Sequence, residues 1–197
     1  MWFRRVERGD SNIEQAYLAT PKMFPKRCVG SSEVVEARPE DWQAVGRFFT
    51  EAWRLAGPGA LGWIGASDQV VAEMTTKEAL LEMLTRPNTR TLIARDRQRV
   101  VGLASIKKID DRTAELSGVV VRQDHIGRGI GSKLLEKARS TAVADGFRTM
   151  TVSTEVNNER AIRFYTSKGF HIAEEKEQDV LGNKVKLLKL ILVLKKI

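Results

Sequence analysis

The sequence predicts an α/β (α+β) fold in which helices flank a mixed, mostly antiparallel central sheet of about seven strands. Segments of strand character alternate with segments of helical spacing in the order β-α-α-β-β-β-α-β-α-β-β. Short polar turns separate three consecutive strands, as antiparallel neighbours allow. A strand-helix-strand unit follows these strands, and this combination favours a mixed sheet covered by helices.

The N-terminal part of the pattern starts with a short strand near residues 34–37. Pro39 and the two acidic residues after it then open a helix, because proline and acidic side chains suit the first helical turn. The run from Gly57 to Gly59 ends this helix. A second helical region is predicted from about Asp68 to Thr85.

The C-terminal part contains the strand-helix-strand unit and a final hairpin. Further helices are predicted at about residues 129–144 and 158–168. Further strands are predicted at about residues 91–94, 99–106, 113–121, 149–154, 170–175 and from 185 onward. Residues 33–197 carry the regular pattern and are expected to form one domain. Residues 1–32 lack periodicity and are expected to be an N-terminal extension or arm.

Composition places the chain among ordinary globular proteins. It has 197 residues, of which 42% are hydrophobic and 29% charged, and this excludes a wholly disordered chain. The net charge of 33 − 25 = +8 favours anionic partners. The single cysteine excludes an internal disulfide, and without a Cys/His cluster no metal site is expected. No segment reaches the ~20 apolar residues of a membrane span. The single cysteine favours a reducing compartment, and the N-terminus lacks the apolar region of a secretory signal, so the expected location is cytoplasmic.

The most informative segment runs from Gly118 to Leu135 and reads as strand, glycine loop and helix. Gly127, Gly129 and Gly131 let the backbone approach a ligand closely, and the N–H groups of the helix start point into the same loop. Such a site suits phosphate oxygens. A plain tight turn is the alternative. The spacing fits neither the P-loop pattern nor the dinucleotide-binding fingerprint.

This loop resembles that of the GNAT superfamily of N-acetyltransferases, whose [Q/R]-x-x-G-x-[G/A] pattern holds the pyrophosphate of acetyl-CoA. The glycines match, whereas Ile126 stands where the family usually has Gln or Arg. A second segment, from Val156 to Phe170, resembles the family signature N-x-x-A-x-x-[FL]-Y-x-x-x-G-F. The signature's fixed positions are occupied by Asn158, Ala161, Phe164, Tyr165, Gly169 and Phe170.

The resemblance implies that acetyl-CoA is the co-substrate and that no metal is needed. It implies that the strand before the loop lends backbone groups to the pantetheine arm and that the loop amides hold the phosphates. The cofactor-binding residues expected on this basis are Val119, Val120, Val121, Ile126, Gly127, Arg128, Gly129, Ile130, Gly131, Ser132 and Asn158. For Asn158, a helix N-cap is the alternative role, and both roles are compatible.

The same resemblance supplies two catalytic candidates. Glu115 lies six residues before Val121, or about 20 Å along a strand, which is comparable to the reach of a pantetheine arm. We expect Glu115 to be the general base, directly or through water, unless it is a surface carboxylate paired with Lys107 or Lys108. Tyr165 matches the family's general acid. A core aromatic with a satisfied hydroxyl is its alternative role.

The expected function is direct transfer of an acetyl group from acetyl-CoA to a primary amine, with a small molecule or a peptide as acceptor. A non-catalytic CoA-binding sensor or structural module is the alternative. Nucleic acid and membrane are not expected as partners, and a homodimer is possible. Four further residues are considered: Glu155 as an alternative base, His125 as an exposed loop residue, His171 as structural, and Trp63 near the acceptor. Cys28 receives no role.

Overall fold

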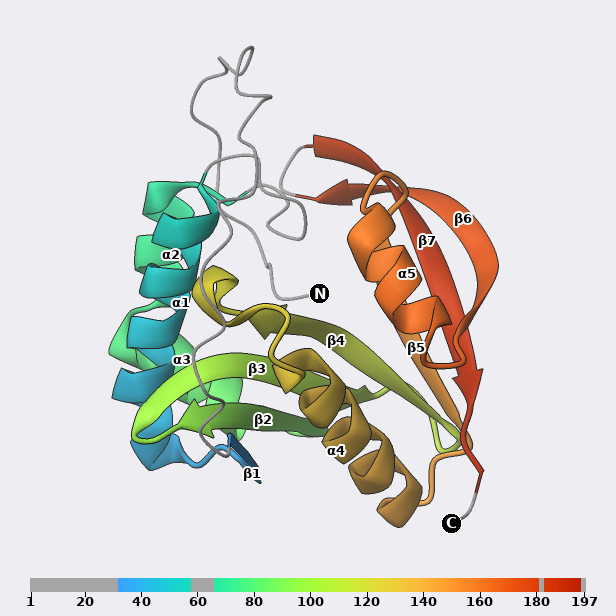
Figure 1. The fold of residues 1–197 in the computed structure, drawn as a ribbon, viewed down its shortest axis with the longest axis horizontal. Coiled ribbons are helices and arrows are strands. Elements are labelled where there is room, and N and C mark those ends of the chain that lie inside the picture. Colours follow the sequence, from blue (N-terminus) through green and yellow to red (C-terminus); the bar gives the residue numbers. More distant parts are fainter. Residues whose placement is uncertain (1–31, 58–65, 181–182, 196–197) are drawn as a thin grey trace.

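The computed structural model describes residues 32–57, 66–180 and 183–195. Its seven strands form one sheet in the order β1-β2-β3-β4-β5-β7-β6, in which only β4 and β5 are parallel (Figure 1). The predicted sheet is thereby confirmed. The strands are β1 (Glu33–Glu36), β2 (Thr89–Asp96), β3 (Arg99–Lys108), β4 (Thr113–Val121), β5 (Thr149–Glu155), β6 (His171–Val180) and β7 (Asn183–Val193).

Helices cover both faces of the sheet. The helices are α1 (Trp42–Ala56), α2 (Asp68–Met74), α3 (Lys77–Thr85), α4 (Ile130–Ala144) and α5 (Glu159–Thr166), with short 3-10 turns η1 (Pro39–Asp41) and η2 (Gln123–His125). On one face, α1 and α3 pack on alternate residues of β2 and β3 such as Ile93 and Leu103. On the other face, α4 and α5 pack on Leu92, Ala104 and the inner residues of β5 and β7.

Two predicted elements differ from the structure. The helical region expected from Asp68 to Thr85 is divided into α2 and α3. The reason is the threonine pair between them: the Thr75 hydroxyl donates to the Val71 carbonyl at 2.8 Å, and the Thr76 hydroxyl caps α3 by accepting from the Ala79 amide. The strand expected to end near residue 175 continues to Val180, because β6 pairs with β7 along its length.

β4 and β5 are neighbours over only part of their length. Their paired positions run from Thr113 and Thr149 to Leu116 and Val152, after which β4 continues alongside β3 alone. At this point β4 has one residue more than β3, since Ser117 and Gly118 together lie opposite Ser105. An extra residue bends and twists its strand. Figure 1 shows the two strands diverging beyond the paired segment.

The start of α4 lies close to β3 because β3 has a glycine beneath it. A Cβ atom added at Gly102 would come within 2.9 Å of the Leu134 side chain, 3.0 Å of the Ile130 side chain and 3.2 Å of the Val120 carbonyl oxygen. Ile130 and Leu134 are both buried. A glycine at this position therefore fixes how deeply the first turn of α4 is seated against the sheet.

We expect the substitution Gly102→Ala to destabilise the protein by about 1–3 kcal/mol, because the added methyl group forces α4 away from the sheet. Chemical denaturation measures this change. Gly131→Ala, in the first turn of α4, is the control: its nearest neighbour would be Phe164 at 3.5 Å, an ordinary contact. Equal stability of Gly102→Ala and the wild type would contradict the packing argument.

Candidate active site

Beyond the bulge, β4 has backbone groups on the side where it is no longer paired with β5. The Arg122 amide donates to the Val101 carbonyl at 3.0 Å, which fixes the alternation of the ladder with β3. Val120 therefore directs its peptide groups toward β3, whereas Val119 and Val121 direct theirs away from it. Of the three valines expected to lend backbone groups, Val119 and Val121 have peptide groups that face away from β3, while Val120 packs against the α1 side.

Tyr165 comes to the same place from α5. Its side chain is buried in the core next to Phe164 and Phe170, with ring centroids 5.1 and 5.5 Å away. The Tyr165 hydroxyl lies beside the Val119 amide. Burial raises the pKa of Tyr165 well above its usual value, and the nearby Val119 amide offsets this only in part. The phenol therefore remains protonated at neutral pH and lies against the diverging end of β4.

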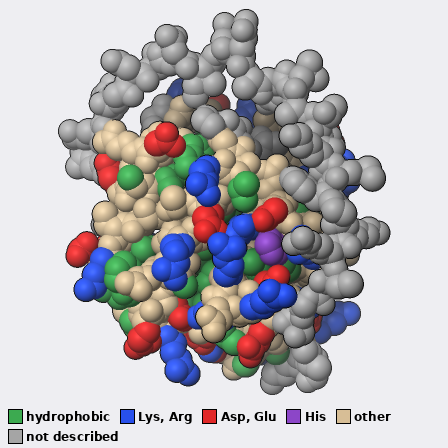
Figure 2. Space-filling view, turned by 60° about the vertical axis from the view of Figure 1, so that its left-hand side comes forward, with side chains coloured by type: hydrophobic (Ala, Val, Ile, Leu, Met, Phe, Trp, Pro, Cys, Tyr) green, Lys and Arg blue, Asp and Glu red, His purple; other side chains and the backbone are tan. Residues whose placement is uncertain are grey.

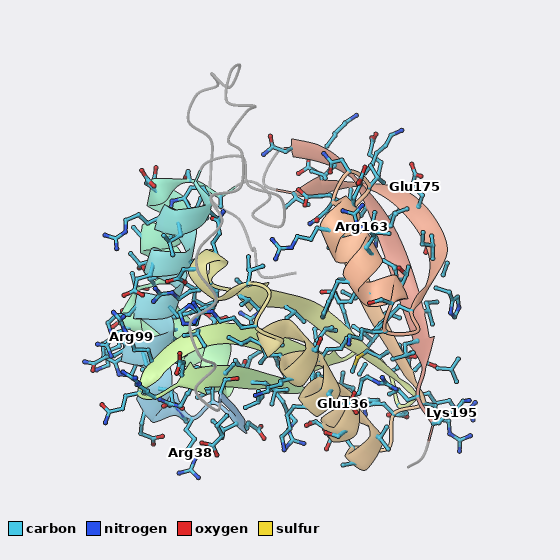
Figure 3. All side chains as sticks on the ribbon, in the orientation of Figure 1. Arg38, Arg99, Glu136, Arg163, Glu175 and Lys195 are labelled. Atoms are coloured by element: carbon cyan, nitrogen blue, oxygen red, sulfur yellow. The ribbon has the colours of Figure 1, made fainter. Side chains whose placement is uncertain are left out.

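Asn158 starts the helix that carries Tyr165. Its side-chain oxygen accepts from the Ala161 amide at 3.1 Å, so the expected N-cap role is confirmed. Glu159 in the first turn and Arg163 in the last turn complement the helix dipole. Figure 3 shows Arg163 on the outer side of α5, opposite the core that holds the tyrosine.

The glycine loop has the backbone geometry of an anion site. Gly127 and Gly129 have φ values of 80° and 77°, which favour glycine strongly, and a Cβ at either would meet nothing within 4 Å. Gly129 is the N-cap of α4 and supplies no side-chain cap. The first amides of α4 therefore lack a capping side chain and point into the loop, as a phosphate site requires.

The loop and the tyrosine helix are neighbours across this site. A Cβ at Gly131 would lie 3.5 Å from Phe164 and 3.8 Å from Val119. Helix α4, helix α5 and strand β4 thus meet at Gly131. The glycine loop and the tyrosine signature, two separate motifs of the sequence, are brought together here with the strand that precedes the loop. The donors suit a pyrophosphate, with Arg128 half-buried in the same loop.

Glu115 and Glu155 belong to the other side of the sheet. Ala114 and Leu116 lie in the core with Tyr165, so the intervening Glu115 side chain projects from the opposite face. Its cross-strand neighbour is Lys107, as the surface-pair alternative requires, and its parallel neighbour is Thr151. Glu115 lies one residue before the end of the β4–β5 pairing, close to where the strands part.

Sequence reasoning missed a charged cluster directly before the loop. The Arg122 side chain is only 10% exposed; its Nε and Nη2 donate to Asp124 at 3.0 and 2.7 Å, and its Nη1 donates to Glu51 of α1. His125 is not the exposed loop residue that was expected, since it is 15% exposed and hydrogen-bonded to Asp124 at 2.7 Å. The available signal was the charged run from 122 to 125 after an apolar strand.

The other candidates have simpler outcomes. His171, which was expected to be structural, is exposed and begins β6. Cys28, Trp63 and nearly all of the predicted N-terminal arm lie outside the described residues. Within the described ranges, no group of three or more His, Cys, Asp or Glu side chains could hold a metal ion. No helix in those ranges is long and apolar enough to span a membrane.

Sequence comparison agrees with this geometry. The profile of the Acetyltransferase (GNAT) family matches residues 39–170. An uncharacterized N-acetyltransferase of Mycobacterium tuberculosis is 36% identical over 91 residues, which are 46% of this chain and 58% of the relative. A Mycobacterium bovis protein of the same description matches equally. The chain thus matches less than two thirds of the length of these curated relatives.

Solved structures share the fold. PaiA N-acetyltransferase from Thermoplasma acidophilum, in complex with coenzyme A, has a TM-score of 0.64 at 20% identity, over 81% of this chain and 98% of that one. YncA from Salmonella typhimurium, with its cofactor acetyl-CoA, has a TM-score of 0.62 at 24% identity, over 84% and 95%. Because the family profile covers more than half of the sequence, the chain belongs to the GNAT family of acetyltransferases.

Proposed function

We propose that the domain formed by residues 33–197 transfers the acetyl group of acetyl-CoA to a primary amine of a small molecule or peptide. The observation that carries this proposal is the meeting of an uncapped, glycine-rich helix start with a diverging strand end and a protonated tyrosine. The coenzyme A and acetyl-CoA complexes of two structural neighbours support the choice of ligand.

The proposal assigns residues to two parts of the ligand, the pyrophosphate and the pantetheine arm. The amides of residues 127–132 would hold the pyrophosphate, assisted by the positive charge of Arg128. The peptide groups of Val119 and Val121 that face away from β3 would bind the amide groups of the pantetheine arm. Ile126 is half-buried and adds no charge, so the amides supply the recognition there. Asn158, the N-cap of α5, already accepts a hydrogen bond from the Ala161 amide and would contact the cofactor from there.

The chemistry needs three proton transfers, because the attacking nitrogen loses a second proton as the amide forms. Acetyl-CoA supplies the activated acetyl group as a thioester. An ammonium group must lose a proton before it can attack. Glu115, one residue before the end of the β4–β5 pairing, is the proposed base, directly or through water. The departing thiolate must gain a proton, and the buried Tyr165 hydroxyl is the proposed donor. The proposed base and the proposed acid would then act from opposite faces of the sheet.

Binding of coenzyme A is the first test. We expect Gly129→Ala to raise the Kd for CoA about tenfold, because an alanine strains the left-handed conformation by about 1–2 kcal/mol and reorients the amides. Titration calorimetry measures the Kd. The control is Gly146→Ala, which changes a glycine of similar φ, 89°, at the other end of α4. Equal Kd values for both variants and the wild type would place the phosphates elsewhere.

The second test concerns the base. An acceptor screen that follows thiol release from acetyl-CoA identifies an amine substrate. On that substrate we expect Glu115→Gln to lower kcat by about 10²–10⁴-fold with unchanged affinity for CoA. Lys107→Met removes the cross-strand neighbour of Glu115 and serves as the control. An equal loss in Lys107→Met would reduce Glu115 to a surface pair, and a loss confined to Glu155→Gln would transfer the role to that residue.

The screen also distinguishes the two functions considered from the sequence. A chain that binds CoA tightly, yet releases no thiol with any polyamine, amino acid or peptide amine, would be the non-catalytic CoA-binding module. Thiol release that depends on Glu115 and Tyr165 supports the transferase.

The third test concerns the acid. Burial raises the pKa of Tyr165, so its phenol should remain protonated where an exposed tyrosine ionises. The chain has two tyrosines. We therefore expect the tyrosinate absorbance of the wild type and of Tyr165→Phe to coincide up to about pH 11. Circular dichroism verifies that both remain folded. A wild-type absorbance step near the ordinary tyrosine pKa that Tyr165→Phe lacks would contradict the assignment.

A further inference from the structure

The cluster of Glu51, Asp96, Arg122, Asp124 and His125, here called the Arg122 cluster, lies at the junction of three elements. Arg122 directly follows β4, Glu51 lies in α1, and Asp96 ends β2. Among the described residues, Arg122 is the one charged residue that is buried. A buried guanidinium is stable only when it is paired, so its partners are held to a defined geometry.

The cluster satisfies this buried charge on two sides. Asp124 accepts two hydrogen bonds from the guanidinium, from Nε and Nη2, and Glu51 accepts one from Nη1. Burial by itself would raise the pKa of Asp124, but the bonds from Arg122 and His125 outweigh it and lower the pKa to about 2. The carboxylate therefore stays charged at neutral pH. His125 extends the cluster toward Asp96, with its Nε2 3.5 Å from that carboxylate.

The glycine loop begins where this cluster ends. Between residues 122 and 129, Arg122 is the only buried residue, so no apolar side chain secures this stretch in the core. After the loop, Ile130 and Leu134 are buried over Gly102 and secure the start of α4. The loop is thus held by packing at its C-terminal end and by ion pairs at its N-terminal end.

Surface charge elsewhere on this side of the molecule is of a different kind. Figure 2 shows acidic and basic side chains interspersed over the face that α1 presents, without a large patch of one sign. Arg99, which lies beside α1 in Figure 3, is 72% exposed, and its Nη2 comes no closer than 3.7 Å to the Glu51 carboxylate. Exposed pairs of that kind contribute little. The buried, two-sided pairing of Arg122 distinguishes it from them.

We propose that Arg122 is the positioning residue of the glycine loop: through Asp124 and Glu51 it fixes the loop against α1, so that the loop amides are preorganised for phosphate. This inference rests on the proposed binding of acetyl-CoA. Arg122 does not touch the substrate itself. A lysine cannot replace it, since an ammonium group cannot bond Asp124 at two points while reaching Glu51.

The test separates positioning from stability and from catalysis. We expect Arg122→Met to raise the KM for acetyl-CoA and the Kd for CoA about ten- to a hundredfold, with kcat at saturation reduced much less. Arg122→Lys should resemble it. Glu51→Gln should raise the same KM by a smaller factor although Glu51 is 71 residues away from Arg122 in sequence. The KM for the amine acceptor should be unchanged in all three.

Arg95→Met is the matched control. Arg95 is a 27% exposed arginine whose Nη2 lies 2.5 Å from Asp41, the N-cap of α1, and it bonds neither Asp124 nor Glu51, so its loss should lower stability without changing the KM for acetyl-CoA. If Arg122→Met does not fold, Glu51→Gln and Asp124→Asn carry the test. Normal affinity for CoA in the Arg122 and Glu51 variants would overturn the positioning role alone. Failure of the wild type to bind CoA would overturn the proposed function, and the positioning role with it.

Discussion

The site depends on one extra residue in β4. Since Ser117 and Gly118 together lie opposite Ser105, the strand keeps its bonds to β3 but turns away from β5 after Leu116. Gly118, with a φ of 133°, adopts a conformation that a side chain would oppose. Beyond this point the peptide groups of Val119 and Val121 that face away from β3 are no longer paired with β5. Without the bulge these groups would be used in a continuous parallel ladder.

Helices α4 and α5 are placed by the same divergence. A continuous sheet would keep β4 and β5 in contact, whereas their separation admits the Tyr165 side chain to the Val119 amide and Phe164 to the side of Gly131. The core beneath is continuous, because residues of α4, β4, β5 and β7 belong to one buried cluster. Packed side chains therefore support the diverging end of β4, which keeps its backbone donors at fixed positions.

The sequence allowed the order of strands and helices, the glycine loop and the cap at Asn158 to be predicted, because each depends on residues that are neighbours in the sequence. Two features could not be predicted. The break between α2 and α3 depends on side-chain bonds of Thr75 and Thr76, within an otherwise helical pattern. The Arg122 cluster joins residues from three separate elements. The charged residues between 122 and 125 indicate a polar site, but local spacing does not show that they meet Glu51 and Asp96.

A phosphate site made of amides imposes a conflict on the chain that builds it. The loop must be poor in side chains so that its N–H groups can approach the ligand, but a loop poor in side chains cannot secure its own position. The structure resolves this conflict outside the loop. Apolar packing over Gly102 holds the helix that follows, while paired charge at Arg122 holds the strand that precedes. Paired charge suits the second task because it is directional: it fixes both the distance and the orientation of the chain leaving β4, whereas apolar contact fixes mainly the distance.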